Sequence, residues 1–285
     1  MAKKFILLTG ASSGIGRATA LELAKNGYTV FAGVRNDRDA AAIKNENIET
    51  LLPIILDVTK AENIEQAFKT LTLTCGDDGL CALINNAGIN YVAPFELSDE
   101  AKERQLMDVN VFGMINTTRK MIPLLQKYVR HDTAGAKIIN VGSIGGAIGL
   151  PWEFSYHVSK FAVLGLSHSL RFELAPLGIK VTCVMPGGVN TPIFDKSLSE
   201  GVKLLIPHDH QNHDYYRKNI DNFAAVAQKL SKNAMPPEKL ARKILNLVNS
   251  TNPPLKLITG VDAKVLNFLA KYNLTNVLAG QLVKK

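Results

Sequence analysis

The spacing of Tyr156 and Lys160 is the pattern in this chain with the clearest chemical meaning. Residues four positions apart lie on one face of a helix, so the phenol and the ammonium group would be neighbours. A nearby ammonium stabilises phenolate and lowers the pKa of a phenol, which is about 10 in water. Of the seven tyrosines, only Tyr156 has a lysine at this offset. The pair predicts proton transfer at a reacting oxygen, the alternative being that Lys160 is an ordinary surface lysine.

Ser143 and Asn110 are two further polar residues with a chemical interpretation. Ser143 follows an apolar run, thirteen residues before Tyr156. Its hydroxyl can hydrogen-bond the carbonyl oxygen that a phenol protonates; the alternative is a loop hydroxyl. Asn110 falls inside a predicted helix, where asparagine is unfavourable, so a buried polar role is expected; the alternative is a solvent-facing side chain. The predicted catalytic residues are Asn110, Ser143, Tyr156 and Lys160.

A glycine-rich segment follows the first apolar run of the chain. Glycines at this spacing let the backbone turn sharply and approach a pyrophosphate without Cβ clashes. The helix that begins there offers free N–H groups and a partial positive charge. A turn that serves only chain reversal is the alternative. The segment predicts a dinucleotide site that contains Gly10, Ser12, Ser13, Gly14, Ile15 and Gly16.

The residues after the second and third apolar runs bear on the adenosine half of such a cofactor. Sites that prefer NAD usually have an acidic residue at the end of the second strand, but Gly33 takes that place here. Arg35 follows, and its guanidinium can pair with a 2′-phosphate, which favours NADP. An exposed loop cation is the alternative, and the nearby Asp37 keeps NAD as the second candidate. Asp57 is expected to accept from the adenine amino group, with Val58 on the ring, unless Asp57 is a helix N-cap.

Two later turns are predicted to line the nicotinamide end. The small residues at 85–88 allow close approach of a cofactor, and the asparagine amides can tie neighbouring strands together. The segment 186–191 can place the Val189 N–H and the Thr191 hydroxyl at the carboxamide, unless it is an ordinary Pro-Gly turn. Lys160 can also hold the nicotinamide ribose. The predicted contacts at this end are Asn86, Ala87, Gly88, Tyr156, Lys160, Pro186, Gly187, Val189 and Thr191.

Short apolar runs alternate with longer amphipathic stretches along the chain. Strands are predicted over 5–9, 29–34, 51–57, 82–86, 137–142, 180–185 and 256–259, and helices over 16–26, 61–73, 99–128, 155–174, 237–249 and 262–278. The alternation favours an α/β fold with a doubly wound parallel sheet, the Rossmann fold. No linker divides the chain, so we expect a single domain over 1–285. Residues 192–235 are expected to form a helical lid over the substrate.

The composition limits the classes of partner. Hydrophobic residues make up 46% and charged residues 20%, which fits a globular protein with a sizeable core. The net charge of +8 is scattered, which favours a solvated surface and no nucleic-acid partner, with attraction to a polyanion as the alternative. No apolar stretch reaches the roughly 18 residues of a membrane helix. Reduced thiols in a cytoplasmic protein are expected for Cys75, Cys81 and Cys183.

A histidine-rich stretch provides one further candidate site. His208, His210 and His213 could be read as metal ligands together with Asp209. The loop setting and the lack of another clear ligand favour a solvated polar loop, so no metal is expected.

Taken together, these residues resemble the short-chain dehydrogenases/reductases over nearly the whole chain. The matching elements, in order, are 9–16, Asp57, 85–88, Asn110, Ser143, 156–160 and 186–191. The resemblance implies that Asn110 anchors a proton-relay water beside Lys160. It also implies a homodimer or homotetramer formed through the helices that carry Asn110 and Tyr156. The segments 30–35 and 252–263 are most similar to the steroid and retinol dehydrogenase branch.

The predicted function is an NADP(H)-dependent oxidoreductase that interconverts a small-molecule alcohol and a ketone or aldehyde, with Tyr156 as acid and base. A β-ketoacyl-type reductase is the alternative within the enzyme class. A non-catalytic NADP(H)-sensing regulator is the alternative outside it, although a sensor needs no phenolate. The sequence does not predict the identity of the substrate.

Overall fold

One parallel sheet organises the molecule. The structure, a computed structural model, describes residues 4–192, 206, 209–231 and 234–274. In these residues seven strands form a sheet in the order β3-β2-β1-β4-β5-β6-β7, and every neighbouring pair is parallel. The strands are β1 (Phe5–Leu8), β2 (Thr29–Val34), β3 (Leu51–Ile55), β4 (Leu80–Asn85), β5 (Ala136–Val141), β6 (Ile179–Pro186) and β7 (Lys256–Thr259). The predicted doubly wound sheet is confirmed.

The strand order reverses between β1 and β4. The chain runs outward from β1 to β3, and β4 then pairs with the free side of β1. Ligands of doubly wound sheets bind beyond the carboxyl ends of the strands at such a reversal. The glycine-rich turn follows β1, and the segment 85–88 follows β4, so both predicted cofactor segments lie at this point.

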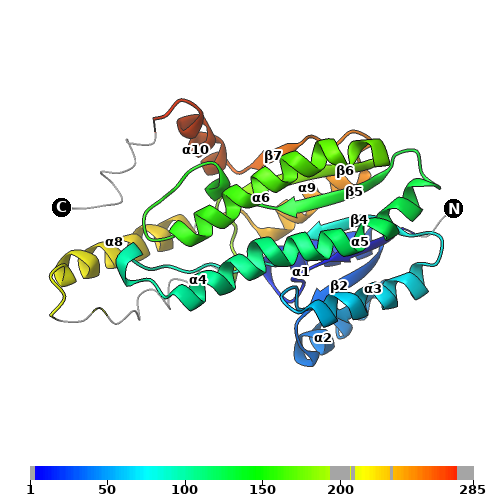
Figure 1. Cartoon of the computed structure of the whole chain (residues 1–285), viewed down its shortest axis with the longest axis horizontal. Helices are drawn as coiled ribbons and strands as arrows, with labels where there is room; N and C mark the ends of the chain where they lie inside the picture. Colours follow the sequence, from blue (N-terminus) through cyan, green and yellow to red (C-terminus); the bar gives the residue numbers. More distant parts are fainter. Residues whose placement is uncertain (1–3, 193–205, 207–208, 232–233, 275–285) are drawn as a thin grey trace.

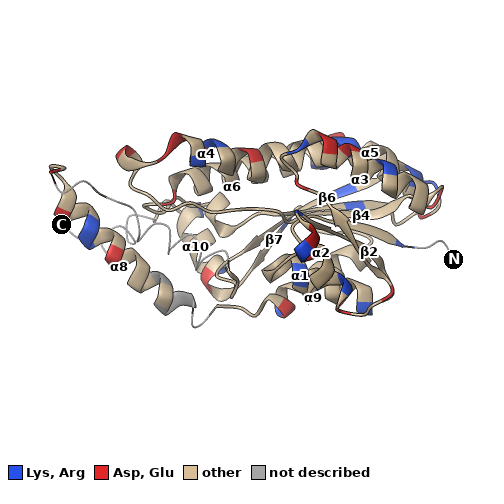
Figure 2. Cartoon of the chain, turned by 90° about the horizontal axis from the view of Figure 1, so that it is seen from below, with Lys and Arg blue, Asp and Glu red and all other residues tan. Residues whose placement is uncertain are grey.

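Helices cover both faces of the sheet (Figures 1 and 2). One face carries α3 (Ala61–Cys75), α4 (Glu100–Met107), α5 (Gly113–Val129) and α6 (Phe154–Glu173). On the other face α1 (Gly14–Lys25) packs against α9 (Pro237–Asn249). The remaining helices are α2 (Asp37–Lys44) beside β3, α10 (Val261–Lys271) after β7, and α8 (His213–Ser231), which extends beyond the sheet in Figure 1.

The interior of the sheet is apolar on both sides. All residues of β1, β4 and β5 are buried, as strands between two helical layers must be. Pro53 lies in β3, where its missing N–H is tolerated because β3 is an edge strand. Cys75, Cys81 and Cys183 are buried free thiols. No helix in the described residues is long and apolar enough to cross a membrane.

Two elements differ from the sequence-based prediction. The helix expected over 99–128 is present without a gap over 100–129, but it contains a wide π-type turn at Asp108–Phe112 between α4 and α5. The helix α2 was not predicted, because it is short and buries only Ile43, which leaves no apolar period to detect. The final helix, predicted over 262–278, ends at Lys271, and residues 272–274 are not helical; residues 275–278 of the predicted span lie outside the described residues.

The described part of the predicted lid is dominated by α8. The rings of Tyr215 and Tyr216 lie 6.3 and 6.0 Å from that of Trp152. Phe223 packs with Val92 and Trp152. These contacts join α8 to the segments that follow β4 and β5. Positions 193–205, 207–208 and 232–233 of the predicted lid lie outside the described residues.

Candidate active site

The glycine turn after β1 has the geometry that its sequence predicts. Gly10 and Gly14 have positive φ values of 69° and 54°, which favour glycine. A Cβ on Gly16 would lie 2.0 Å from the Gly10 carbonyl oxygen, so only glycine fits there. Ser13 is the N-cap of α1, yet its side chain makes no capping hydrogen bond. The turn therefore offers a helix N-terminus and a hydroxyl group to a ligand.

Asn86 connects the end of β4 to this turn. Its Nδ2 donates to the carbonyl oxygens of Thr9 and Gly10, at 3.0 and 2.9 Å. The Thr9 hydroxyl in turn accepts from the backbone N–H groups of Asn86 and Ala87, at 3.0 Å each. The neighbouring Asn85 donates to Asn140 of β5 at 2.8 Å. These bonds bear out the prediction that the asparagine amides tie neighbouring strands together.

Asn110 is fully buried in the π-type turn between α4 and α5. Its amide donates to the Ile89 carbonyl at 2.9 Å and to the Ser159 hydroxyl at 3.0 Å, and its oxygen accepts from the Ile89 N–H at 2.8 Å. The solvent-facing alternative is therefore excluded. Wide turns of this kind occur frequently at functional sites, and this one aims a polar side chain at the loop after β4.

Ser143, Tyr156 and Lys160 come together beside that loop. The Ser143 side chain lies close enough to the Tyr156 phenol to lower its pKa. The Lys160 ammonium lies 5.5 Å from the centroid of the Tyr156 ring and donates to the Val141 carbonyl at 3.1 Å. Lys160 is only 6% exposed, which excludes the surface-lysine alternative. A serine hydroxyl, a phenol and an ammonium therefore occupy one region beyond the carboxyl end of β5.

Gly88 separates Asn110 from Lys160. A Cβ on Gly88 would lie 3.3 Å from the Asn110 Oδ1 and 3.8 Å from the Lys160 Nζ. The missing side chain leaves both polar groups facing the same small volume. All four predicted catalytic residues are thus neighbours in the structure.

The pKa of Tyr156 differs from the sequence-based expectation. Tyr156 keeps some accessible surface but lies deep in the protein, and this burial raises its pKa to about 12. The Ser143 hydrogen bond opposes that rise, and the negative charge of Glu153 adds to it. Burial likewise lowers the pKa of Lys160 to about 8. The expected lowering by Lys160 is not seen, because its ammonium lies over the ring and is bonded to Val141, and desolvation prevails.

The predicted adenosine end lies at the ends of β2 and β3. Arg35 is exposed directly after β2, and with Asp57 and Arg104 it lines a hollow of about 390 Å³. No ion pair of Arg35 is recorded within the described part of the chain. Asp57 is not the N-cap of α3; it accepts from the N–H and the hydroxyl of Thr59, at 3.0 and 2.7 Å. Val58 is buried, and a Cβ on Gly113 would come within 2.6 Å of it.

The segment after β6 crosses to the glycine turn. A Cβ on Gly14 would lie 3.0 Å from the Thr191 methyl group, so the two segments are in contact. Val189 forms an isolated parallel bridge with Met235. The Gly187 N–H donates to the Thr259 carbonyl at 3.0 Å, and Pro186 ends β6. The segment predicted to hold the nicotinamide therefore contacts the glycine turn after β1.

Two residues that shape the site were missed from the sequence. The Asp262 carboxylate accepts from the Gly188 N–H at 2.6 Å and holds the segment after β6. His157 interacts with the Gly145 carbonyl through Nδ1 and accepts from the Leu150 N–H through Nε2, each at 3.0 Å. Burial lowers the pKa of His157, which keeps it neutral, as the acceptor role requires. The neighbouring sequence indicates neither of these roles, although His157 directly follows Tyr156.

Comparison with protein families identifies this architecture. The model of the short chain dehydrogenases matches residues 4–201. The chain belongs to the short-chain dehydrogenase family. The curated relatives are named dehydrogenases or reductases, so this protein is an oxidoreductase.

Several relatives match this short-chain dehydrogenase along most of its length. A 3-amino-tetrahydro-pyrrolizinone reductase from Xenorhabdus hominickii is 34% identical over 97% of this chain and 93% of its own. A 3-ketodihydrosphingosine reductase from Bacteroides thetaiotaomicron is 34% identical over 93% and 91%. Retinol dehydrogenase 5 from Mus musculus is 30% identical over 94% and 84%.

Solved structures share the fold. A short-chain dehydrogenase from Streptomyces avermitilis has a TM-score of 0.78 at 27% identity, covering 98% of this chain and 96% of the other. A 3-ketoacyl-(acyl-carrier-protein) reductase from Brucella melitensis, complexed with NADH, has a TM-score of 0.72 at 25% identity, covering 90% and 96%.

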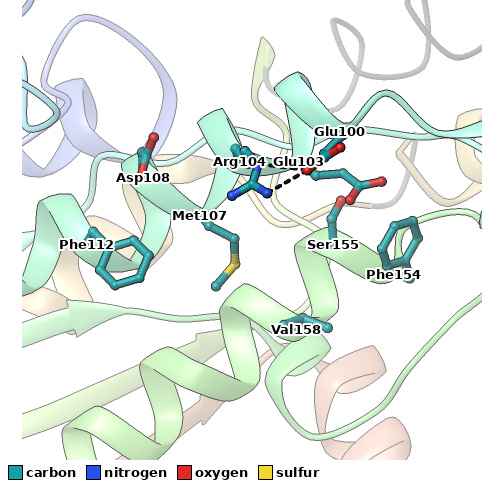
Figure 3. A pocket seen from close by; sticks show the side chains of 9 residues that line it. All are labelled: Glu100, Glu103, Arg104, Met107, Asp108, Phe112, Phe154, Ser155 and Val158. Atoms are coloured by element: carbon teal, nitrogen blue, oxygen red, sulfur yellow. Dashed lines mark hydrogen bonds and ion pairs between the residues drawn. The ribbon is translucent and has the colours of Figure 1, made fainter.

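A second hollow of about 450 Å³ lies on the outer side of this dehydrogenase, between α4 and α6 (Figure 3). Phe112 and Val158, which line it, are 52% and 55% exposed. Arg104 is hydrogen-bonded to Glu100, which lies four residues before it on α4 (Figure 3). None of the four predicted catalytic residues lines this hollow.

The histidines singled out from the sequence do not gather into a metal site in the described residues. His210 lies 3.6 Å from Glu96, and His213 lies 3.0 Å from Asp214. His208 falls outside the described residues.

Proposed function

We propose that this enzyme is an NADP(H)-dependent reductase that converts a ketone or aldehyde into the alcohol, with Tyr156 as the proton donor. The observation that carries the proposal is the grouping of Ser143, Tyr156 and the Lys160 ammonium beyond the carboxyl end of β5. Such a set has no use in a protein that only senses a cofactor, which argues against the regulator alternative.

The crevice fits a nicotinamide dinucleotide. Gly16 admits no side chain and Gly10 turns with positive φ, so the backbone can approach a pyrophosphate at the start of α1. Ser12, Ser13 and Ile15 would meet the phosphates, and Asn86 to Gly88 would line the nicotinamide side. Asp57 and Val58 would hold the adenine, and Pro186, Gly187, Val189 and Thr191 the carboxamide. The Brucella melitensis reductase, which is complexed with NADH, supports this class of cofactor.

Arg35 supports NADP over NAD. Its guanidinium is exposed at the end of β2, beside a hollow that Arg104 also lines. A 2′-phosphate placed there would meet a planar cation.

Ser143 and Tyr156 would bind the same carbonyl oxygen. The Ser143 side chain is close enough to the Tyr156 phenol to lower its pKa, so a carbonyl oxygen bound beside them would accept from both hydroxyl groups. The bound cofactor supplies the hydride to the carbonyl carbon. As negative charge develops on the oxygen, Tyr156 passes its proton to it, and the Lys160 ammonium, 5.5 Å from the centre of the ring, is the cation beside the phenolate that remains. Asn110 and Lys160 face one volume beside Gly88, which suits a water that returns the proton.

The raised pKa of Tyr156 agrees with its role as proton donor in the reduction. A phenol with a pKa of about 12 is protonated at neutral pH and is ready to donate. Two of the curated relatives are named reductases, whereas another is a retinol dehydrogenase.

Replacement of Tyr156 by Phe tests the function. Turnover of NADPH with a panel of ketones, steroids, retinoids and acyl thioesters should fall by at least about a thousandfold, since the proton donor is lost. The dissociation constant for NADPH should stay within about threefold. Substantial turnover by Tyr156→Phe would refute the assigned donor. Preferential turnover of acyl thioesters would instead favour a β-ketoacyl-type reductase.

We also propose that a second copy of the chain packs on α6. Val158, Phe161 and Phe172 are exposed on one face of that helix, at 55%, 47% and 76%. Gly165 lies on the same face with open space around it. The substitution Phe161→Glu should lower the mass measured by light scattering, whereas Leu73→Glu on α3 should leave it unchanged. An unchanged mass in both variants would refute this contact.

A further inference from the structure

Glu153 is a buried acid that the proposed mechanism does not use. It is only 7% exposed and lies three residues before Tyr156. It is the N-cap of α6, where an acidic side chain usually accepts from the helix N–H groups. The Glu153 carboxyl makes no such bond. Helix capping therefore does not explain why a glutamate occupies this buried position.

The recorded partner of this carboxyl in the described part of the chain is Asn90, whose amide donates to Glu153 Oε1. A carboxylate has two oxygens and can accept several hydrogen bonds, so one amide does not satisfy it. Glu153 takes part in no recorded ion pair among the described residues. Burial raises its pKa, because a buried charge without a cation is unfavourable.

Glu153 lies close to Tyr156 and to the segment that follows β4. Asn90 follows Ile89, which Asn110 holds in place. The residue before Glu153, Trp152, accepts from the Ala93 N–H at 2.9 Å, which joins the start of α6 to the segment after β4. The negative charge of Glu153 is near enough to raise the pKa of Tyr156. The carboxyl thus adjoins the place where the carbonyl would bind.

We propose that Glu153 binds an ammonium group of the substrate, so that the preferred substrates are ketones with a protonated amine close to the carbonyl. Glu153 is the N-cap of the helix that carries Tyr156 and lies less than one helical turn before it, which suits an amine close to the carbonyl. The inference rests on the proposed reduction at Tyr156. A bound ammonium would also offset the negative charge that opposes ionisation of that phenol.

A purely structural role is the competing explanation. In that case Glu153 is a neutral acid that holds the segment at Asn90 through one hydrogen bond. A glutamine retains an oxygen that can accept from Asn90 but carries no charge. The variant Glu153→Gln therefore separates charge recognition from support of the fold.

The test compares two ketones of the same shape, α-aminoacetophenone and propiophenone, in which a methyl group replaces the ammonium. With NADPH, Glu153→Gln should lower kcat/KM for the amino ketone by about 100-fold and for propiophenone by less than about threefold. The control Glu173→Gln removes the same charge at the far end of α6 and should change neither value. An equal change for both ketones, or no change for the amino ketone, would overturn the proposal while leaving the reductase function standing.

If the wild-type protein turns over neither ketone, that result would count against the proposed function. A binding measurement would then test the ammonium site by itself. Calorimetry would compare 2-amino-1-phenylethanol with 1-phenylpropan-1-ol in the presence of NADP⁺. Tighter binding of the amine to the wild type, lost in Glu153→Gln, supports the ammonium site. Equal binding of the two alcohols, or no binding of the amine, rejects it.

Discussion

The Asn86 amide donates to the Gly10 carbonyl at 2.9 Å and so fastens the end of β4 to the turn after β1. The same nitrogen also reaches the Thr9 carbonyl. One side chain thereby holds two strand ends at the point where the sheet order reverses. The glycine turn takes its backbone shape from its own residues, but its position depends on this contact.

Replacement of Asn86 by Ala should weaken both the fold and cofactor binding. Two hydrogen bonds to carbonyl oxygens are lost, which should lower the free energy of unfolding by about 2 kcal/mol. The dissociation constant for NADPH, measured by fluorescence titration, should rise about tenfold because the turn is no longer held. Asn116→Ala is the control, since Asn116 is exposed on α5 and bonds only to Arg119 in the recorded contacts. Wild-type affinity in Asn86→Ala would contradict the role assigned to this contact.

Gly16→Ala should be far more damaging than another glycine substitution. The added methyl group would lie 2.0 Å from the Gly10 oxygen and 2.5 Å from the Asn86 amide nitrogen, so the backbone must move. We expect a loss of about 3 kcal/mol in denaturant unfolding and a loss of NADPH binding. Gly149 has open space around it, so Gly149→Ala should change stability by less than about 0.5 kcal/mol. Similar midpoints for the two variants would show that the turn tolerates a side chain.

Arg35→Ala should change the choice of cofactor. Loss of the guanidinium removes the proposed partner of the 2′-phosphate, so the dissociation constant for NADPH should rise by about 10- to 100-fold. The constant for NADH should change by less than about threefold. Arg38 is the matched control, because it is exposed three positions later and lies 3.7 Å from Asp39. Equal losses for NADPH and NADH would reject the phosphate role.

His157 should make stability fall in mild acid. Burial lowers its pKa from the ordinary 6.5, so the unfolded chain takes up a proton there more readily than the folded one. The stability from this group is complete above about pH 6.5 and is lost as the pH falls. Urea unfolding at pH 7 and pH 5 should show a larger loss for the wild type than for His157→Asn. His131 is exposed, and His131→Asn should behave like the wild type. Equal losses in wild type and His157→Asn would contradict the prediction.

The sequence alone determined the sheet and the order of its strands along the chain. Buried parallel strands need continuous apolar runs, and Gly10, Gly14 and Gly16 meet a local backbone requirement, so both leave a signal in neighbouring residues. The close approach of Tyr156 and Lys160 follows from one turn of helix.

Only the tertiary structure decided how the site is supported. Asn110 and Ser159, which are hydrogen-bonded, are 49 residues apart in the sequence, and Gly188 and Asp262 are 74 residues apart. The local pattern of apolar and polar residues does not predict hydrogen bonds between such distant positions. The pKa of Tyr156 likewise depends on the tertiary structure. Its sequence spacing from Lys160 predicts a lowered value, but the protein that surrounds the phenol excludes water, and this desolvation outweighs the neighbouring cation.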